Sequence, residues 1–463
     1  MNQDTICAVS TAPGCGGIAV IRVSGPDAIS ICNSIFIPRK AGKNLSERKA
    51  YSLTFGSITG ENGPIDDVIV ALFRTPHSFT GEDTIEITCH GSTFIQQEIL
   101  HLLIEKGCRS ALPGEYTQRA FLNGKMDLSQ AEAVADLIAS TSAGQHKLAL
   151  RQMRGEFSNQ LATLRSQLLD FTSLIELELD FSEEDVEFAN RTHLKQLAGE
   201  IERLIGRLAD SFRVGNAIKN GIPVAIIGET NAGKSTLLNL LVGEERAIVS
   251  DIHGTTRDVI EDTITLSGIT FRFIDTAGIR ETTDRIESLG IERTFQKLDQ
   301  ASILLWVIDL TTSAGQIEAL ARTILPKADG KKTILVFNKA DLLSPAELEA
   351  KQHLLSAVPA ERLYISAKQR SNTNQLETRL LEAAALPDLS SPDIIVTNIR
   401  HYEALTHARF AIQRVLEGLA QNISGDFLSQ DIRECMHYLG EITGQISTDE
   451  ILGNIFGKFC IGK

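Results

Sequence analysis

Helical periodicity dominates two long stretches of the chain. Residues 114–222 and 393–463 contain none of the twelve prolines, and helix interiors tolerate proline poorly. Within the first stretch, apolar side chains recur at steps of three and four residues: Val134, Leu137 and Ile138, then Leu161, Leu164, Leu168 and Phe171. This spacing predicts amphipathic helices.

The pattern changes between these stretches. Short runs rich in β-branched and aromatic residues alternate there with polar or helical segments, at 224–227, 271–274, 303–308, 333–337 and 363–365. Continuous apolar runs joined by helical crossovers indicate a largely parallel sheet that is covered on both faces. We therefore predict an α/β domain inserted into a helical one, whose two parts pack together.

A third pattern occupies the first 120 residues. Strand-like runs occur at 17–23, 68–73 and 84–88, and a helix is expected near 93–106. This mixture predicts a small α+β domain. The whole chain then divides into an α+β domain (1–120), a first helical part (121–218), the α/β domain (219–382) and a second helical part (383–463).

Bulk composition narrows the class of protein. The 463 residues are 43% apolar and 22% charged, as in soluble globular proteins. A net charge of −14 argues against a protein that grips nucleic acid mainly through its own surface. Seven cysteines without a C-x-x-C pair fit a reducing cytosol. No segment has the length of a bilayer span, so a cytoplasmic location is expected.

A complete phosphate-binding loop follows the first strand of the α/β domain. It reads Gly228-Glu229-Thr230-Asn231-Ala232-Gly233-Lys234-Ser235. Its backbone amides can donate to phosphates where the loop enters a helix. Lys234 is expected to reach the β- and γ-phosphates and Ser235 to ligate Mg²⁺. The remaining contacts are expected from Asn231, Ala232, Gly233 and Thr236.

Two later segments can sense the γ-phosphate. In Asp275-Thr276-Ala277-Gly278, the Asp275 carboxylate can reach the metal through water, and the Gly278 amide can turn toward the γ-phosphate. Thr255 and Thr256 lie in an earlier loop, and we select Thr256 as a further Mg²⁺ ligand. An ordinary polar loop stays the alternative there.

Asn338-Lys339-Ala340-Asp341 predicts specificity for guanine. The Asp341 carboxylate can accept from both N1–H and the 2-amino group of guanine. Adenine lacks both donors, and discrimination of this kind reaches roughly 10⁴-fold. Lys339 is expected to lie over the base. In Ser366-Ala367-Lys368, the amide of Ala367 is expected to donate to O6.

The residue after the Asp-Thr-Ala-Gly segment bears on hydrolysis. Many small GTPases place a water-orienting glutamine there, but this chain has Ile279, which cannot orient water. The Asn231 side chain could instead help to hold a monovalent cation near the phosphates. The Glu287 carboxylate could orient water, although its pattern alone favours a solvated helix position.

Together these motifs resemble the MnmE (TrmE) family of tRNA-modification GTPases. Two further stretches carry the resemblance beyond the nucleotide motifs: Ser78-Phe79-Thr80-Gly81-Glu82-Asp83 with Pro113-Gly114-Glu115-Tyr116-Thr117, and Phe459-Cys460-Ile461-Gly462-Lys463. The resemblance covers the whole chain. It implies an N-terminal tetrahydrofolate-binding domain and a Ras-like G domain inserted in a discontinuous helical domain.

The resemblance also implies a mechanism. A homodimer forms through the N-terminal domains, and GTP with K⁺ brings the G domains together and activates hydrolysis. The K⁺ contacts then come from Asn231, Ser250, Ile252 and Thr255. Glu287 becomes the water-orienting acid, acting with Lys234.

The same resemblance implies a partner and a product. A flavin-dependent protein, MnmG (GidA), acts with such GTPases, and a heterotetramer is expected. Together they add an aminomethyl or carboxymethylaminomethyl group at C5 of the wobble uridine of certain tRNAs. 5,10-Methylene- or 5-formyl-tetrahydrofolate supplies the one-carbon unit, and the partner is expected to hold most of the tRNA.

The folate site carries over onto Arg22, Glu82, Lys125 and Lys463. A basic residue suits the glutamyl tail of folate and an acid can pair with the pterin ring. The resemblance places Cys460 near this site, whereas a plain buried thiol is the alternative.

Two other functions stay open from the sequence. One is a GTPase switch that assists ribosome assembly without modification chemistry. The other is a folate-dependent transferase that acts alone. The folate-type N-terminal segment and the terminal Phe459 to Lys463 segment favour tRNA modification.

Overall fold

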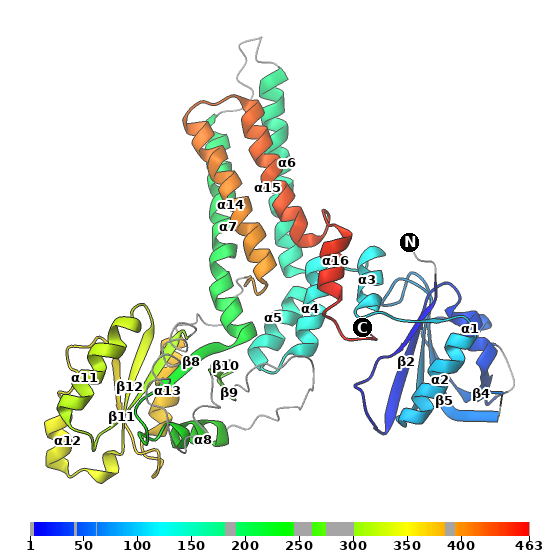
Figure 1. Ribbon diagram of the computed structural model, residues 1–463. Coiled ribbons are helices and arrows are strands. Elements are labelled where there is room, and N and C mark those ends of the chain that lie inside the picture. The colour runs from blue at the N-terminus through cyan, green and yellow to red at the C-terminus, as the bar shows by residue number, and fades with distance from the viewer. Residues whose placement is uncertain are drawn as a thin grey trace. The chain divides into compact units, whose positions relative to one another are not determined.

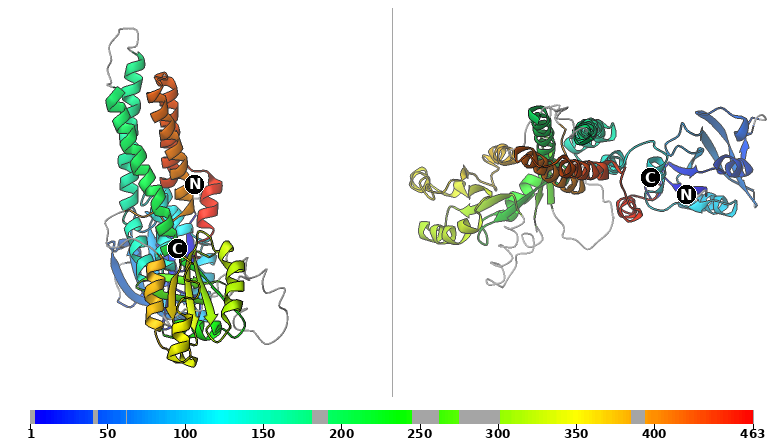
Figure 2. Two further views of the ribbon diagram at one scale, coloured as in Figure 1. Left: turned by 90° about the vertical axis from the view of Figure 1, so that its left-hand side faces the viewer. Right: turned by 90° about the horizontal axis from the view of Figure 1, so that it is seen from above.

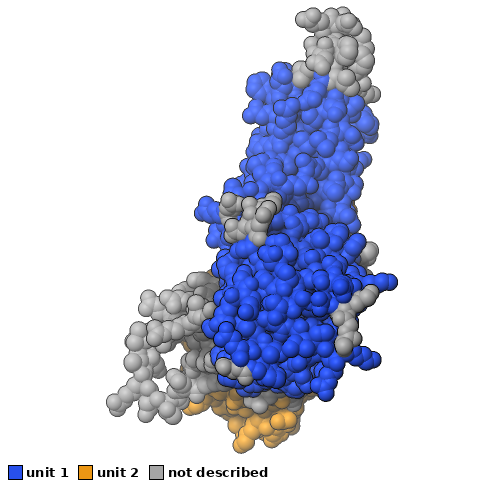
Figure 3. Space-filling view, turned by 90° about the vertical axis from the view of Figure 1, so that its right-hand side faces the viewer, with its two compact units in different colours: residues 1–139, 149–203, 404–463 blue, residues 140–148, 204–403 orange. Residues whose placement is uncertain are grey.

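The computed structural model describes residues 4–40, 44–61, 63–180, 191–244, 262–274, 301–384 and 394–462. They belong to two compact units, which Figure 3 colours separately. Unit 1 comprises residues 1–139, 149–203 and 404–463, and unit 2 comprises residues 140–148 and 204–403.

Unit 1 begins with a seven-stranded sheet in the order β3-β4-β5-β6-β2-β1-β7. Its strands are β1 (Ile6–Val9), β2 (Ile18–Ser24), β3 (Phe36–Pro38), β4 (Ser52–Gly60), β5 (Gly63–Phe73), β6 (Thr84–His90) and β7 (Arg109–Ser110). Neighbouring strands are antiparallel except for β1 and β7. Two helices, α1 (Ala28–Ile35) and α2 (Thr93–Glu105), contribute to the core with one face of this sheet (Figure 1).

Alternation along these strands gives the sheet two different faces. Ile21, Val23, Ile85 and Ile87 point into the core under the helices, while the residues between them point to the other face. The α+β fold and the predicted strands near 17–23, 68–73 and 84–88 are confirmed, as is the helix near 93–106. Strands β1, β3, β4 and β7 were not predicted.

The remaining helices of the first half are α3 (Glu115–Leu122), α4 (Leu128–Ala139), α5 (Ala143–Met153), α6 (Glu156–Asp180) and α7 (Arg191–Asn220). Those near the end of the chain are α14 (Ile399–Ala420), α15 (Gly425–Thr443) and α16 (Asp449–Phe456). Leu164, Leu168 and Phe171 are fully buried, as their spacing predicted.

Helices from before and after the α/β domain pack together within unit 1. Helix α15 lies against α6, and Arg409 of α14 donates to Glu202 of α7 at 2.8 Å (Figures 1 and 2). The prediction of a discontinuous helical domain is therefore confirmed. Helices α5, α7 and α14 each contribute residues to both units.

Unit 2 contains a six-stranded sheet in the order β13-β12-β11-β8-β10-β9. Its strands are β8 (Ile222–Ile227), β9 (Asp262–Leu266), β10 (Ile269–Phe273), β11 (Ile303–Asp309), β12 (Lys332–Asn338) and β13 (Glu361–Tyr364). All pairs are parallel except β9 with β10. The five predicted strands are confirmed, and β9 was not predicted.

Helices cover both faces of this sheet. Apolar residues of α8 (Lys234–Glu244) and α13 (Thr373–Ala384) fill one core layer, and those of α11 (Ala314–Ile324) fill the other (Figure 2). A further short helix, α12 (Pro345–Lys351), begins with a capping box at Ser344. The continuous apolar strands are thus buried on both sides, as a parallel sheet requires.

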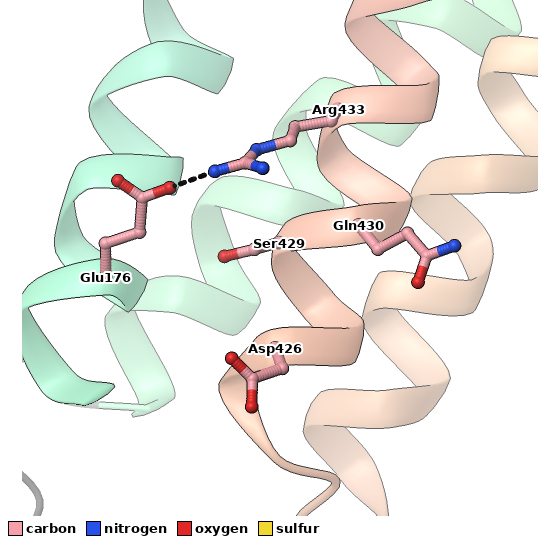
Figure 4. Close-up of a pocket in the computed structure, with 5 residues that line it drawn as sticks. All are labelled: Glu176, Asp426, Ser429, Gln430 and Arg433. Carbon is pink, nitrogen blue, oxygen red and sulfur yellow. Dashed lines mark hydrogen bonds and ion pairs between the residues drawn. The ribbon is translucent and has the colours of Figure 1, made fainter. Parts of the chain in front are cut away.

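A polar cavity of about 420 Å³ lies between α6 and α15 of unit 1. Glu176 and Arg433 pair across it at 2.6 Å, and Asp426, Ser429 and Gln430 complete its lining (Figure 4). None of these five is a residue that the sequence motifs selected. Among the described residues, no helix is both long enough and apolar enough to cross a bilayer.

Candidate functional site

The phosphate-binding loop joins β8 to α8, as predicted. Gly228 has a φ of +150° and Gly233 a φ of +98°. A Cβ at either position would lie 2.2 Å from its nearest neighbour, which is the Val307 carbonyl oxygen or the Asn338 Nδ2. Only glycine fits there. The loop is therefore a concave backbone at a helix N-terminus, which suits an anionic phosphate.

Lys234 folds back over this loop. Its Nζ donates to the carbonyl oxygens of Gly228 and Glu229, both at 2.7 Å. The next two residues lie in the first turn of α8, where Ser235 is half-buried and Thr236 is exposed. Asn231 is exposed at the tip of the loop with a φ of +65°. The ammonium group is thus held where phosphate oxygens would compete for it.

Asn338 fastens three separate segments to one another. Its Nδ2 donates to the Ala232 carbonyl oxygen at 2.8 Å, and its Oδ1 accepts from the Ala367 amide at 2.9 Å. Both bonds are buried. The structure therefore brings the phosphate-binding loop, the Asn338 motif and the Ser366 motif together, although more than 100 residues separate the first two.

Lys339 is held by an acid that the sequence analysis did not select. Its Nζ lies 2.6 Å from Asp309 Oδ2 at the end of β11. Burial would raise the pKa of Asp309, but the hydrogen bonds from Lys339 and Thr311 outweigh burial and lower it. The ion pair therefore fixes the direction of the Lys339 side chain within the Asn338–Asp341 motif.

The other base-recognition residues differ in exposure. Asp341 is exposed in the short 3-10 helix 340–342, and Lys368 is exposed as well. Ser366 and Ala367 are buried behind them. The Asp341 carboxylate is thus open to solvent, whereas the Ala367 amide is buried and held by Asn338.

Several predicted residues lie outside the described residues. These are Ser250, Ile252, Thr255, Thr256, Asp275, Thr276, Ala277, Gly278, Glu287 and Lys463. Their assigned roles stay predictions.

A second group of predicted residues lies on the sheet of unit 1. Arg22 of β2 pairs with Glu86 of β6 at 2.8 Å. Its guanidinium lies 5.6 Å from the ring centroids of both Phe79 and Tyr116. Cation–π contacts of this kind orient an arginine without neutralising it. Arg22 is thus fixed on the sheet face opposite to α1 and α2.

Glu82 lies in the loop before β6 and accepts hydrogen bonds from two side chains. Ser24 Oγ donates to its Oε2 at 2.7 Å, and Arg119 Nη1 donates to Oε1 and Oε2 at 3.1 and 3.2 Å. Thr80 and Thr84 join Ser24 in a buried hydroxyl cluster beneath this carboxylate. These hydrogen bonds fix the Glu82 carboxylate on the side of Ser24 and Arg119, and the side chain remains partly exposed to solvent.

The other two described residues of this group are Lys125 and Cys460. Lys125 Nζ donates to the Pro76 carbonyl oxygen at 2.8 Å. The Cys460 carbonyl oxygen accepts from the Gly114 amide at 3.3 Å, and Ser10 Oγ donates to the Gly462 carbonyl oxygen at 3.0 Å. Cys460 is exposed, so the alternative of a plain buried thiol is wrong.

Sequence reasoning missed Arg119, Ser24 and Asp309. Arg119 contacts Glu82 and Asp4, which lie 37 and 115 residues away. No local spacing predicts such contacts. Asp309 carried a usable signal, because an acid that ends a parallel strand lies at the edge where ligands bind.

Comparison with known proteins decides the family. A model described as the MnmE helical domain matches residues 128–460, and one described as the GTP-binding protein TrmE N-terminus matches residues 5–125. The chain belongs to the MnmE family. A tRNA modification GTPase MnmE of Bacteroides fragilis is 65% identical over 468 residues, which cover all of both chains. The MnmE of Flavobacterium johnsoniae is 53% identical, again over both full lengths.

Solved structures match part of the chain. Era in complex with MgGDPNP and a 16S ribosomal RNA fragment aligns at 28% identity with a TM-score of 0.28. The alignment covers 41% of this chain and 66% of Era.

Proposed function

We propose that the chain is a GTP hydrolase that acts in tRNA modification. The observation that carries this proposal is the pair of buried bonds from Asn338, which joins the phosphate-binding loop to the guanine motif and to Ala367. A site built in this way recognises the base and the phosphates as one ligand. The MnmE relatives that are 65% identical to this chain over its full length support the same function.

Magnesium fits the oxygen ligands at the start of α8. Ser235 supplies a half-buried hydroxyl next to Lys234. Ser235 would hold the ion together with Thr256, and with Asp275 through water. The bound ion would neutralise charge on the phosphates. Lys234 would exchange its two carbonyl partners for phosphate oxygens and so bring its charge to the transferred group.

We propose K⁺ as a second cation, held by Asn231 with Ser250, Ile252 and Thr255. Asn231 is exposed at the tip of the loop, with an amide oxygen that can ligate an alkali ion. Ile279 cannot orient water, so Glu287 would take that role. Hydrolysis should be faster in KCl than in NaCl, and Asn231→Ala should remove the difference. Equal rates for the unmodified protein would contradict this part of the proposal.

The unit 1 site fits a folate. Arg22 and Lys125 supply positive charge for glutamyl carboxylates, Glu82 can accept from a pterin N–H, and Phe79 offers a ring surface with its side chain 39% exposed. With Lys463 they would hold 5,10-methylene- or 5-formyl-tetrahydrofolate, which supplies a one-carbon unit when bound. Cys460 has an exposed thiol, and the backbone carbonyl oxygens of Cys460 and Gly462 accept hydrogen bonds from Gly114 and Ser10 of the N-terminal domain.

The same sheet face supports a homodimer through the N-terminal domain. Across the sheet from Glu86, the residues that share its face are Ala71 and Leu53 by strand register. Around them lie large apolar side chains that are 43% to 72% exposed, namely Ile37, Tyr51, Leu53, Phe55 and Ile69. Exposed apolar groups gathered in this way indicate a protein interface.

The negative net charge of the chain supports a partner protein that binds the tRNA. At −14 the chain is poorly suited to hold a polyanionic tRNA by itself. We propose that a flavoprotein of the MnmG (GidA) type binds most of the tRNA and forms a heterotetramer with this dimer. Together they would add the aminomethyl or carboxymethylaminomethyl group at C5 of the wobble uridine.

Mass spectrometry of tRNA nucleosides tests this function. A deletion strain should lose the C5-modified wobble uridine, the unmodified gene should restore it, and Lys234→Ala should not. Normal modification in the deletion strain would overturn the proposal. An altered ribosomal subunit profile in that strain would then favour the GTPase switch in ribosome assembly.

A further inference from the structure

Arg119 lies at the centre of a charged cluster beneath the proposed folate site. It belongs to α3, and its side chain is 8% exposed. Nη1 donates to the Asp4 carbonyl oxygen at 2.9 Å as well as to both oxygens of Glu82. Nη2 donates to Asp4 Oδ1 at 2.8 Å and to Glu115 Oε1 at 2.9 Å.

The guanidinium is itself fixed from its far side. Glu115 accepts from Arg109 Nη1 and Nη2 at 3.1 and 2.6 Å and from the Leu112 amide at 2.8 Å. Asp4 accepts from Arg109 Nε at 2.6 Å. Two planar forks that share two carboxylates allow little rotation. Arg119 is therefore a rigid support, whereas a lone surface arginine is mobile.

The bonds to Glu82 leave a defined opening on its carboxylate. A carboxylate has about four acceptor positions, two on each oxygen. Ser24 occupies one position on Oε2, and one N–H of Arg119 Nη1, shared between the two oxygens, faces the second position on Oε2 and one on Oε1. One position on Oε1 remains, and the side chain is 22% exposed.

We propose that Arg119 is a positioning residue for the folate site, which turns the open position of Glu82 Oε1 toward one N–H of the pterin ring. Arg119 acts through Glu82 and does not touch the ligand. This role rests on the proposed folate binding, because Arg119 would orient Glu82 so that its carboxylate can accept from the bound folate. It also assigns Glu82 a single hydrogen bond to the ring.

Affinity for 5-formyl-tetrahydrofolate tests this role, measured by calorimetry on the full-length chain together with the melting temperature. Arg119→Gln should weaken binding about tenfold or more, as loss of a charge-assisted bond does. Arg409→Gln is the matched control, because it removes a charge-assisted hydrogen bond to Glu202 between α14 and α7, where it has no contact with Glu82 or Arg119. It should lower the melting temperature and change the affinity less than about twofold.

Coupling to Glu82 separates positioning from general stability. In a Glu82→Gln background, Arg119→Gln should weaken binding by less than about twofold more, since the two residues act as one unit. If Arg119→Gln does not fold, Arg119→Lys takes its place in both backgrounds, because it keeps the charge and loses the planar fork.

The possible outcomes separate the positioning role of Arg119 from folate binding itself. Unchanged affinity in the Arg119 variants, or full additivity with Glu82→Gln, would overturn the positioning role and leave folate binding intact. Absence of binding by the unmodified protein would overturn both.

Discussion

Gly233→Ala should disable the nucleotide site through Asn338. The added Cβ would lie 2.2 Å from Asn338 Nδ2, on a backbone with a φ of +98°. Alanine in a left-handed conformation costs about 1–3 kcal/mol. If the amide moves aside, the Ala232 carbonyl and the Ala367 amide each lose a buried bond, at about 1–3 kcal/mol each. The lower figures already reach about 3 kcal/mol, more than a hundredfold in an equilibrium constant.

The assay is the affinity for a fluorescent GDP analogue, combined with urea unfolding of the same protein. Either the loop shifts and affinity falls more than about a hundredfold, or Asn338 shifts and the free energy of unfolding falls by about 3 kcal/mol. Gly243→Ala is the matched control, since this exposed helical glycine in α8 has open space around it in the described structure. It should keep full affinity and gain up to about 1 kcal/mol. A Gly233→Ala protein with unchanged affinity and stability would refute the reasoning.

Three further predictions follow from other parts of the molecule. Asp341→Asn should weaken GTP binding and gain affinity for xanthosine triphosphate, whose O2 accepts where guanine donates; unchanged preference in competition binding would remove the role of Asp341. Phe55→Glu should shift the proposed dimer to monomer in analytical ultracentrifugation, while Phe94→Glu on α2, where the phenylalanine is even more exposed, should not; a dimer that survives Phe55→Glu would place the interface elsewhere. The pKa values of Asp4 and Glu115 lie below their ordinary values of 3.8 and 4.5. For Asp4 the largest cause is the hydrogen bond from Arg109. For Glu115 burial would raise the pKa, but the hydrogen bonds from Arg109 and Arg119 outweigh it. The stability that these two carboxylates contribute is therefore present at pH values above 3.8 and 4.5 and is lost as the pH falls below them. Glu115→Gln should lower the free energy of unfolding by about 1–3 kcal/mol at neutral pH and should weaken the fall in melting temperature at acid pH. An unchanged fall in melting temperature at acid pH would contradict this.

The strands of unit 2 were predictable because burial on both faces produces continuous apolar runs. Strand β11 is buried from Ile303 to Ile308 and stood out for that reason. Strand β9 was missed because it lies at the edge of the sheet, where only Ile264 and Leu266 are buried. In β4 the apolar side chains of Leu53 and Phe55 face outward, so the usual alternation of apolar-in and polar-out residues was reversed there.

The candidate sites divide in the same way. The phosphate-binding loop and the guanine motif are local sequences, so spacing and chemistry were enough to find Lys234 and Asp341. Arg119 contacts Glu82 and Asp4, which are distant in the chain, and only its contact with Glu115 follows a local helical spacing. Contacts of that kind become visible only when the fold is known.

The anchoring of residues 460–462 to the N-terminal domain has a consequence for biosynthesis. The sheet of unit 1 can form once residue 125 has left the ribosome, but Ser10 and Gly114 must wait about 335 residues more for their partners Gly462 and Cys460. At a translation speed of roughly 5–20 residues per second, that wait lasts between about 17 and 67 s. Until residues 460 to 462 have emerged, an N-terminal domain that has already folded therefore lacks the hydrogen bonds that Ser10 and Gly114 make with them.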